Sequence, residues 1–390
     1  MSFDDIIDRR GTRSAKWDAM EPLYGVSPDD GLAMWVADMD FRSPECVIKA
    51  AQDLTDHGVF GYRAGNDDYK AAIIWWMENR HNWTVKPEEI FTTYGLVNAV
   101  GMCLNTYTEK GDEIVLFTPV YHAFAKVINN AGRRVKECEL VQKDGVYHMD
   151  FDAYDAQMTG EEKMLILCSP HNPSGRLWSE QELRDVAAFA KRHDLLIVSD
   201  EIHNDIVFPG KKHHPMPLAA PDCLDRLIML TAPSKTFNIA GNHDGNVIIH
   251  DADLRAKFNA TMLSLGVSST LYGTEMTKAA YSPEGAKWVD EMREYIAENA
   301  RVFDEGINAI PGLKSMPMDS TYLAWVDFSG TGMPMSEVLD RVRKQAKIAP
   351  NDGPTFGTGG EPFLRFNLGT PRANVEEAIS RLQSAFADLQ

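Results

Sequence analysis

Four polar side chains that could carry out chemistry each follow an apolar run of the sequence. They are Tyr121, Asn172, Asp200 and Lys235, which come after EIVLF, KMLILCS, LLIVS and LIMLTA in that order. A lysine amine can act as a nucleophile or a base, and a nearby carboxylate can hold a positive charge. Taken alone, each residue also has a structural interpretation, as a core tyrosine, a turn asparagine, a capping aspartate or a surface lysine.

The apolar runs are continuous rather than alternating, which is typical of strands covered on both faces. Between the second and third runs, Ser179 and Glu182 form a capping-box pattern, and apolar residues at helical spacing follow. A strand, a capped helix and a second strand predict a crossover unit in a largely parallel sheet. Because ligands bind beyond the carboxyl ends of such strands, we expect the four side chains to face one crevice.

This combination suits catalysis with pyridoxal phosphate. A lysine amine can form a Schiff base with the aldehyde of that cofactor. A carboxylate can keep the pyridine nitrogen protonated, an aromatic ring can stack on the cofactor, and an amide can polarise its phenolic oxygen. Hydroxyl groups and N–H groups at a helix start can hold the phosphate.

The pattern changes after about residue 282. A long amphipathic stretch at 284–310 predicts a helix, short strand-like pieces follow, and a second helix at 373–389 closes the chain. The predicted fold class is therefore α/β, with a large domain whose mostly parallel sheet is flanked by helices and a smaller α+β C-terminal domain. We expect residues 1–44 to join the small domain, 45–285 to form the large cofactor-binding domain, and 286–390 to form the small one.

The composition argues against several other classes of protein. The formal charge of the 390-residue chain is -18 at pH 7, which disfavours nucleic acid or an anionic membrane as a partner. The sequence shows no stretch apolar enough to span a bilayer and no secretory-type start. The five cysteines are odd in number and show no C-x-x-C spacing. We predict a cytoplasmic location.

No metal site is predicted. His213 and His214 are adjacent and lack an acidic residue at ligand spacing, so we interpret them as part of a solvated loop.

Several segments make the resemblance to a known family specific. They are MWVADMDFRSP (34–44), GYR (61–63), TPVYHAF (118–124), SPHNPSGRLW (169–178), SDEIHNDIVF (199–208), APSKTFNIAG (232–241) and FLRFNLGTPR (363–372). With these segments the sequence resembles the fold-type I pyridoxal phosphate enzymes of the class I/II aminotransferase superfamily. Within them it is most similar to the cystathionine β-lyase (C–S lyase) branch, over nearly the whole chain.

The resemblance implies a role for each residue at the cofactor ring. Lys235 matches the catalytic lysine of the Schiff base, and Asp200 matches the carboxylate at the pyridine nitrogen. Asn172 matches the amide near the phenolic oxygen, and Tyr121 matches the stacking aromatic ring. His203 stands near the cofactor oxygen, at a position where many aminotransferases have tyrosine.

The resemblance also implies phosphate and substrate contacts. Ser234 and the backbone at Leu96 and Val97 match phosphate contacts. Tyr62 matches a tyrosine that reaches the phosphate of the neighbouring subunit, which implies a homodimer with shared active sites. The residues matched to an amino acid substrate are Ala37, Tyr121, Asn172 and Arg365, and the Arg365 guanidinium suits a carboxylate.

The activity implied by the branch is β-elimination on an S-substituted cysteine such as cystathionine, which gives pyruvate, ammonia and a thiol. An aminotransferase is the alternative, because the two reactions share the same machinery. A third hypothesis is a regulatory protein that keeps the fold for binding a partner, although the charge of -18 disfavours a DNA-binding role.

Overall fold

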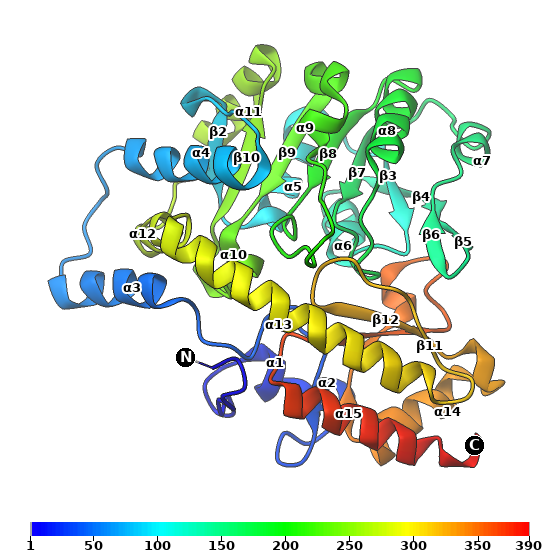
Figure 1. Ribbon diagram of the computed structural model, residues 1–390. Coiled ribbons are helices and arrows are strands. Elements are labelled where there is room, and N and C mark those ends of the chain that lie inside the picture. The colour runs from blue at the N-terminus through cyan, green and yellow to red at the C-terminus, as the bar shows by residue number, and fades with distance from the viewer. Residues whose placement is uncertain (1, 390) are drawn as a thin grey trace.

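The computed structural model describes residues 2–389, and its largest element is a seven-stranded sheet (Figure 1). In spatial order the strands are β2 (Ile90–Thr93), β10 (Gly245–Ile249), β9 (Leu227–Thr231), β8 (Leu196–Asp200), β7 (Glu162–Cys168), β3 (Glu113–Thr118) and β4 (Arg134–Glu139). Neighbouring strands are parallel except where β10 runs antiparallel to β2 and β9. The predicted mostly parallel sheet is confirmed, with one reversed strand.

Both faces of this sheet are buried, because alternate residues of each strand enter two different hydrophobic clusters. In β3, Ile114 and Leu116 pack in the cluster that contains α5 (Leu96–Tyr107). Val115 and Phe117 point the other way, into the cluster that contains α8 (Glu180–Arg192). A strand covered on both faces has no solvent-facing positions, which explains the continuous apolar runs in the sequence.

The helices that cover the two faces include connections between strands, and helices that precede the first strand of this sheet or follow its last one. The cluster with α5 also includes residues of α6 (Ala123–Asn130) and α11 (Ala252–Leu265). The cluster with α8 (Glu180–Arg192) also includes residues of α4 (Asp67–His81). The predicted capping box of α8 is present, since Ser179 Oγ accepts from the Glu182 N–H at 3.2 Å and the Glu182 carboxylate accepts from the Ser179 N–H at 2.8 Å.

A second, antiparallel sheet lies below the large one in Figure 1. Its strands in order are β11 (Lys314–Ser315), β12 (Leu323–Asp327), β15 (Phe363–Asn367) and β14 (Asn351–Asp352). The predicted helices on this part are α13 (Pro283–Asn308) and α15 (Arg372–Ala385). The N-terminal segment joins it through β1 (Leu32–Ala33), which pairs in parallel with β13 (Ile348–Ala349).

The predicted domain boundary at 285/286 falls within the first turn of α13, so one helix is continuous across it. The division of the chain into domains stays a prediction. The remaining elements are α1 (Ala15–Asp18), α2 (Met20–Tyr24), α3 (Glu45–His57), β5 (Val141–Lys143), β6 (Val146–His148), α7 (Phe151–Asp155), α9 (Met216–Ala219), α10 (Pro233–Thr236), α12 (Leu271–Ala280) and α14 (Met335–Asp340).

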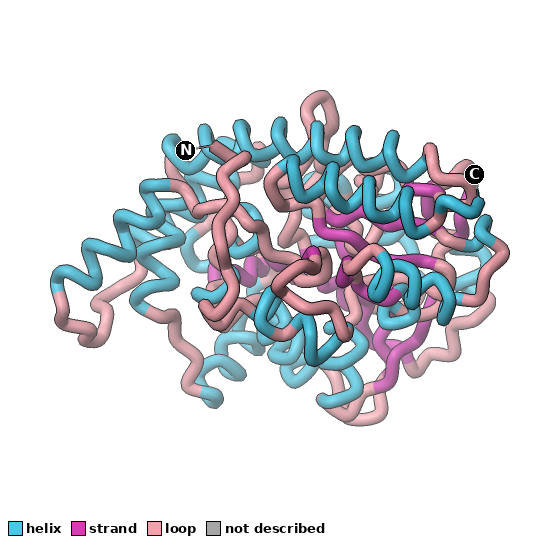
Figure 2. Tube along the Cα trace, turned by 90° about the horizontal axis from the view of Figure 1, so that it is seen from below, coloured by secondary structure: helices cyan, strands magenta, loops and turns pink. Residues whose placement is uncertain are grey.

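The stretch from α3 to α4 projects from one end of the molecule, as two perpendicular views show (Figures 1 and 2). Its connecting loop spans residues 58–66 and exposes Val59, Phe60 and Tyr62. Within residues 2–389, each helix is too short or too polar to span a bilayer.

Candidate active site

The four side chains singled out by the sequence follow neighbouring strands of the large sheet. Lys235 lies in α10 after β9, and Asp200 is the last residue of β8. Asn172 follows β7, and Tyr121 follows β3. Because β9, β8, β7 and β3 are consecutive and parallel, their carboxyl ends share one edge of the sheet.

The amine of Lys235 is held inside the molecule. Its Nζ donates a hydrogen bond of 2.7 Å to the backbone carbonyl of Ala37, and the hydroxyl of Tyr322 donates to the same oxygen at 3.0 Å. Burial, helped by the charge of Arg365, lowers the pKa of Lys235 to about 8, while Asp38 and Asp200 oppose this change. The neutral, reactive form of the amine is therefore well populated slightly above neutral pH.

The carboxylate of Asp200 has little to compensate its charge. Among residues 2–389, its one hydrogen-bond donor is the backbone N–H of Ile202, at 3.1 Å. Burial raises its pKa to about 7, and the charge of Glu201 adds to the effect while that of Lys235 opposes it. A positively charged ligand group placed against this carboxylate would be strongly favoured.

Arg365 joins the two sheets at the site. It lies in β15, and its Nη1 donates to Asn172 Oδ1 at 2.8 Å. Its Nη2 donates to the carbonyl of Trp35 at 2.7 Å and to Asn351 Oδ1 at 2.5 Å. The guanidinium also lies 5.0 Å from the centre of the Phe356 ring.

The charge of Arg365 has no carboxylate partner within the part of the chain that the structure describes. Its Nε is buried without a hydrogen-bond acceptor, and burial lowers the pKa of Arg365 to about 10. A buried guanidinium that lacks an anion is well suited to bind the carboxylate of a ligand.

His203 and Tyr322 complete the buried surroundings. The two rings meet edge to face, with their centres 5.9 Å apart. Burial lowers the pKa of His203 to about 3, so its imidazole is neutral, and its Nδ1 has no hydrogen-bond partner in residues 2–389. Tyr322 was missed by the sequence interpretation because it begins the apolar stretch YLAWV, which indicates only a strand.

The residues predicted to contact a phosphate lie at two helix starts. Leu96 and Val97 open α5 directly after Gly95, whose positive φ of 80° favours glycine. Ser234 lies in the short α10, one residue before Lys235. Tyr62 is not brought into this group in the single chain, because it is fully exposed on the loop at 58–66.

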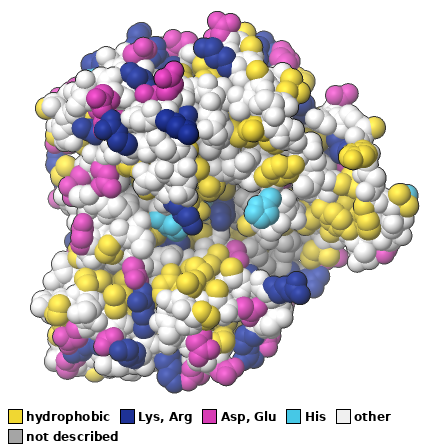
Figure 3. Space-filling model, turned by 180° about the vertical axis from the view of Figure 1, so that it is seen from behind, with side chains coloured by type: hydrophobic (Ala, Val, Ile, Leu, Met, Phe, Trp, Pro, Cys, Tyr) yellow, Lys and Arg dark blue, Asp and Glu magenta, His cyan; other side chains and the backbone are white. Residues whose placement is uncertain are grey.

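Pyridoxal phosphate and an amino acid would satisfy the groups that this chain leaves unsatisfied. A protonated pyridine nitrogen matches the isolated Asp200 carboxylate, and a substrate carboxylate matches Arg365. The buried Nδ1 of His203 has no hydrogen-bond partner in residues 2–389, and a polar atom of a ligand could supply one. The residues present therefore fit the cofactor. Figure 3 shows a hollow between the upper and lower parts of the molecule, where histidine and basic side chains gather.

The prediction that His213 and His214 lie in a solvated loop is wrong for His213. This residue is buried, and its Nε2 lies 2.6 Å from the buried Glu201 carboxylate, while His214 is half-buried. The acidic partner was not recognised because Glu201 is twelve residues earlier in the sequence and reaches His213 only in the fold. Across residues 2–389, no group of three His, Cys, Asp or Glu side chains is arranged to hold a metal ion.

Comparison with known proteins places these observations in a family. The chain is 39% identical to cystathionine beta-lyase PatB of Bacillus subtilis (strain 168), over 99% of this chain and 100% of the relative. It is 31% identical to protein MalY of Escherichia coli (strain K12), over 98% of both chains.

Solved structures agree in fold. Cystalysin from Treponema denticola, which contains pyridoxal 5'-phosphate, superposes with a TM-score of 0.94 at 34% identity and covers 100% of this chain and 99% of its own. The PLP-bound C–S lyase from Staphylococcus hominis gives a TM-score of 0.90 at 28% identity, covering 99% of this chain and 98% of its own. The family model for aminotransferase class I and II matches residues 31–382, and the chain belongs to this family.

Proposed function

We propose that this chain is a pyridoxal 5'-phosphate-dependent C–S β-lyase that converts an S-substituted cysteine such as cystathionine into pyruvate, ammonia and a thiol. The observation that carries the proposal is the buried arrangement of the Lys235 amine, the isolated Asp200 carboxylate and the Arg365 guanidinium without a carboxylate partner. The full-length relative named a cystathionine beta-lyase and the related C–S lyase support this reaction over others of the family.

The cofactor would be held by groups from several strand ends. When bound, pyridoxal phosphate supplies an aldehyde and an electron-withdrawing ring that accepts charge from the α-carbon of the substrate. Asp200 would face the ring nitrogen, and Tyr121 would stack on the ring. The Oδ1 of Asn172 is occupied by Arg365, which leaves its amide N–H groups to donate to the phenolic oxygen. His203, whose ring packs against Tyr322, would lie near the same oxygen.

The phosphate would be held by N–H groups and a hydroxyl group. The backbone of Leu96 and Val97 at the start of α5 offers N–H donors, which suit an anion. The hydroxyl of Ser234 adds a donor next to Lys235.

Lys235 would move the proton of the α-carbon. With a pKa of about 8, its neutral amine can accept a proton and return it within the physiological pH range. The 2.7 Å hydrogen bond to the carbonyl of Ala37 orients this amine, and Tyr322 shares that carbonyl. Arg365 would hold the substrate carboxylate, with Ala37 close to the amino acid.

We also propose a cytoplasmic homodimer whose active sites are shared between the subunits. The loop at 58–66 presents Val59, Phe60 and Tyr62 to solvent, and exposed apolar side chains gathered on a projecting loop favour burial against a partner. Tyr62 would then reach the phosphate bound by the neighbouring copy. Light scattering of the holoenzyme should give twice the mass of the chain, and Tyr62→Phe should weaken cofactor retention without changing that mass.

An assay with cystathionine and no keto acid tests the reaction. A lyase releases pyruvate and ammonia continuously, and Lys235→Ala should lower the rate by at least about 10³-fold and remove the visible absorbance band. The alternative, an aminotransferase, would turn over only after a keto acid is added. Absence of pyruvate from wild-type holoenzyme with several S-substituted cysteines would refute the lyase proposal.

A further inference from the structure

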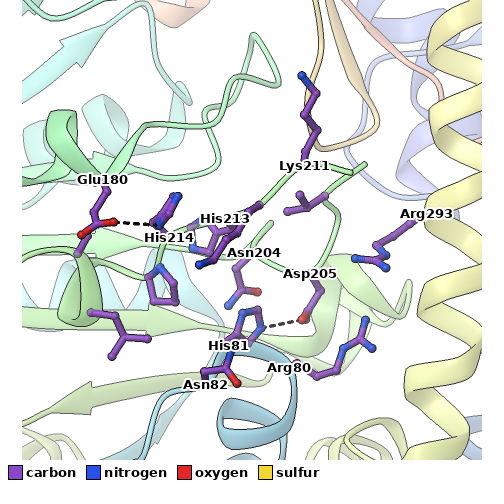
Figure 4. Close-up of a pocket in the computed structure, with 15 residues that line it drawn as sticks. Arg80, His81, Asn82, Glu180, Asn204, Asp205, Lys211, His213, His214 and Arg293 are labelled. Atoms are coloured by element: carbon purple, nitrogen blue, oxygen red, sulfur yellow. Dashed lines mark hydrogen bonds and ion pairs between the residues drawn. The ribbon is translucent and has the colours of Figure 1, made fainter. Parts of the chain in front are cut away.

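A second cavity of about 370 Å³ lies between the end of α4, the loop after β8 and helix α13. Within residues 2–389, its lining includes none of the residues assigned to the candidate active site. In Figure 4, Arg80 and Arg293 point toward one another on one side, and His81, Asn204 and His213, which we call the floor, lie between them and Glu180. The volume is in the range of small-molecule sites.

The basic side chains of this cavity outnumber the carboxylates available to them. Arg80 and Arg293 share a single carboxylate, since both bind Asp290 Oδ1, at 2.7 and 2.8 Å. The Nε of Arg293 is buried and has no acceptor in the described part of the chain. Lys212 is exposed and forms no ion pair within residues 2–389.

The two carboxylates of the lining are already engaged. Asp205 accepts from His81 Nε2 at 2.8 Å and Trp76 Nε1 at 3.0 Å through Oδ1, and from Thr236 Oγ1 at 3.0 Å through Oδ2. Glu180 forms a close ion pair with Arg184, outside the cavity, and its Oε2 lies 3.9 Å from His214 Nδ1 within the lining (Figure 4). Lys211 is paired with Asp319 at 2.8 Å, whereas Lys212 and the Nε of Arg293 have no acceptor within residues 2–389.

A protein of net charge -18 has little general attraction for anions, so an excess of donors in one cavity must act locally. Guanidinium and ammonium groups at a partly enclosed site favour phosphate or carboxylate oxygens. The hydrogen bonds of Asp205 and of His213 with Glu201 hold the floor in place, which lowers the cost of ordering on binding. We infer that this cavity binds a small dianion of the phosphate or dicarboxylate type.

Calorimetric titration of the holoenzyme with inorganic phosphate, and separately with malonate, tests the inference at constant ionic strength. We expect saturable binding in the wild type and the same affinity in Lys191→Met, which changes an exposed lysine at the far end of α8 that forms no ion pair within residues 2–389. Lys212→Met and Arg293→Gln should each weaken binding by about tenfold, because each removes a charged donor. The tighter of the two probes identifies the type of ligand.

Arg365→Lys separates this cavity from the substrate site, since an anion bound at Arg365 would lose affinity in that variant and cavity binding would not. Lys212→Met alters an exposed side chain, so it remains informative if Arg293→Gln does not fold. The inference is overturned by an absence of saturable binding, by equal affinity in wild type and Lys212→Met, or by binding that is lost only in Arg365→Lys.

Discussion

At the scale of single residues, burial moves the pKa values of Lys235 and Asp200 toward each other. Burial lowers the pKa of Lys235 to about 8 and raises the pKa of Asp200 to about 7. Both shifts favour the neutral form, as expected when a charge loses its water. The cofactor-free chain therefore stores unfavourable electrostatic energy at the site, and a ligand that brings a positive group to Asp200 would relieve part of it.

Asp200→Asn should make the cofactor-free protein more stable at pH 8 by roughly 2 to 4 kcal/mol. The folded-state pKa of about 7 lies above the unfolded value near 4, so the native state binds more protons between these values. The contribution of Asp200 to wild-type stability consequently falls as pH rises through this window, whereas the variant lacks this contribution. Urea unfolding of the wild type and of Asp200→Asn at pH 5 and pH 8 measures this difference in pH dependence.

Asp56→Asn, a change on the surface of α3, is the control and should leave the pH dependence of stability unaltered. A slope in Asp200→Asn equal to that of wild type would contradict the assignment of the effect to Asp200.

Arg365→Lys should raise KM for the amino acid substrate by about 10- to 100-fold, because an ammonium cannot reproduce a bidentate contact with a carboxylate. We expect a smaller change in kcat, since the variant leaves Lys235 and Asp200 in place. Steady-state kinetics of pyruvate release measure both constants. Arg301→Lys, on the exposed face of α13, serves as the control, and an unchanged KM in Arg365→Lys would exclude the proposed contact.

The sequence indicated the polar residues at strand ends because each follows a recognisable apolar run. Two contacts of the site could not be predicted in this way. The oxygen that holds the Lys235 amine belongs to the backbone of Ala37, and any residue type could supply a carbonyl there. Tyr322 reaches the same oxygen from the small sheet, and its place depends on how the two sheets meet.

At the scale of elements, the sequence predicts a helix or a strand where residues that are close in the sequence determine it. The helix at α8 could be predicted to its first residue because the Ser179–Glu182 box satisfies the N–H groups of its first turn. The reversed direction of β10 could not be predicted. An apolar run that is buried on both faces has no pattern that distinguishes a parallel strand from an antiparallel one.

Ser179→Ala should lower the free energy of unfolding by about 1 kcal/mol and leave kcat unchanged, because the cap stabilises α8 and lies outside the site. Thermal and urea unfolding give the loss of stability. Ser384→Ala, an exposed position in α15, should change stability by less than about 0.5 kcal/mol. Equal losses in both variants would show that the cap contributes nothing specific.

At the scale of the whole molecule, the N-terminal segment is anchored by a buried ion pair. Lys16 Nζ lies 2.7 Å from Asp40 Oδ2, and Arg9 and Trp17 also donate to this carboxylate. The charges of Lys16 and Arg9 hold the pKa of Asp40 below its usual value despite burial, which raises it. This anchor fixes the stretch that carries Ala37 into the site.

Lys16→Met should lower the free energy of unfolding by about 3 kcal/mol, because it leaves a buried carboxylate with less compensation. The lowered pKa of Asp40 means that the stabilisation is present above pH 4 and is lost as pH falls, so the difference from wild type should shrink in acid. Urea unfolding at about pH 2.5 and at pH 7 measures this difference. Lys49→Met, which breaks a surface pair with Asp53, should cost less than about 0.5 kcal/mol.

Arg365 links Asn172, which follows β7 of the large sheet, to Asn351 of the small sheet. We propose that the same guanidinium binds the substrate carboxylate. Substrate preference in this scaffold would then depend on how the two sheets are tilted as well as on the residues that touch the ligand. Helix α13 contacts α12 on one side and α15 and β11 on the other, so substitutions along it would change this tilt, and with it the affinity for substrate, without altering the catalytic groups.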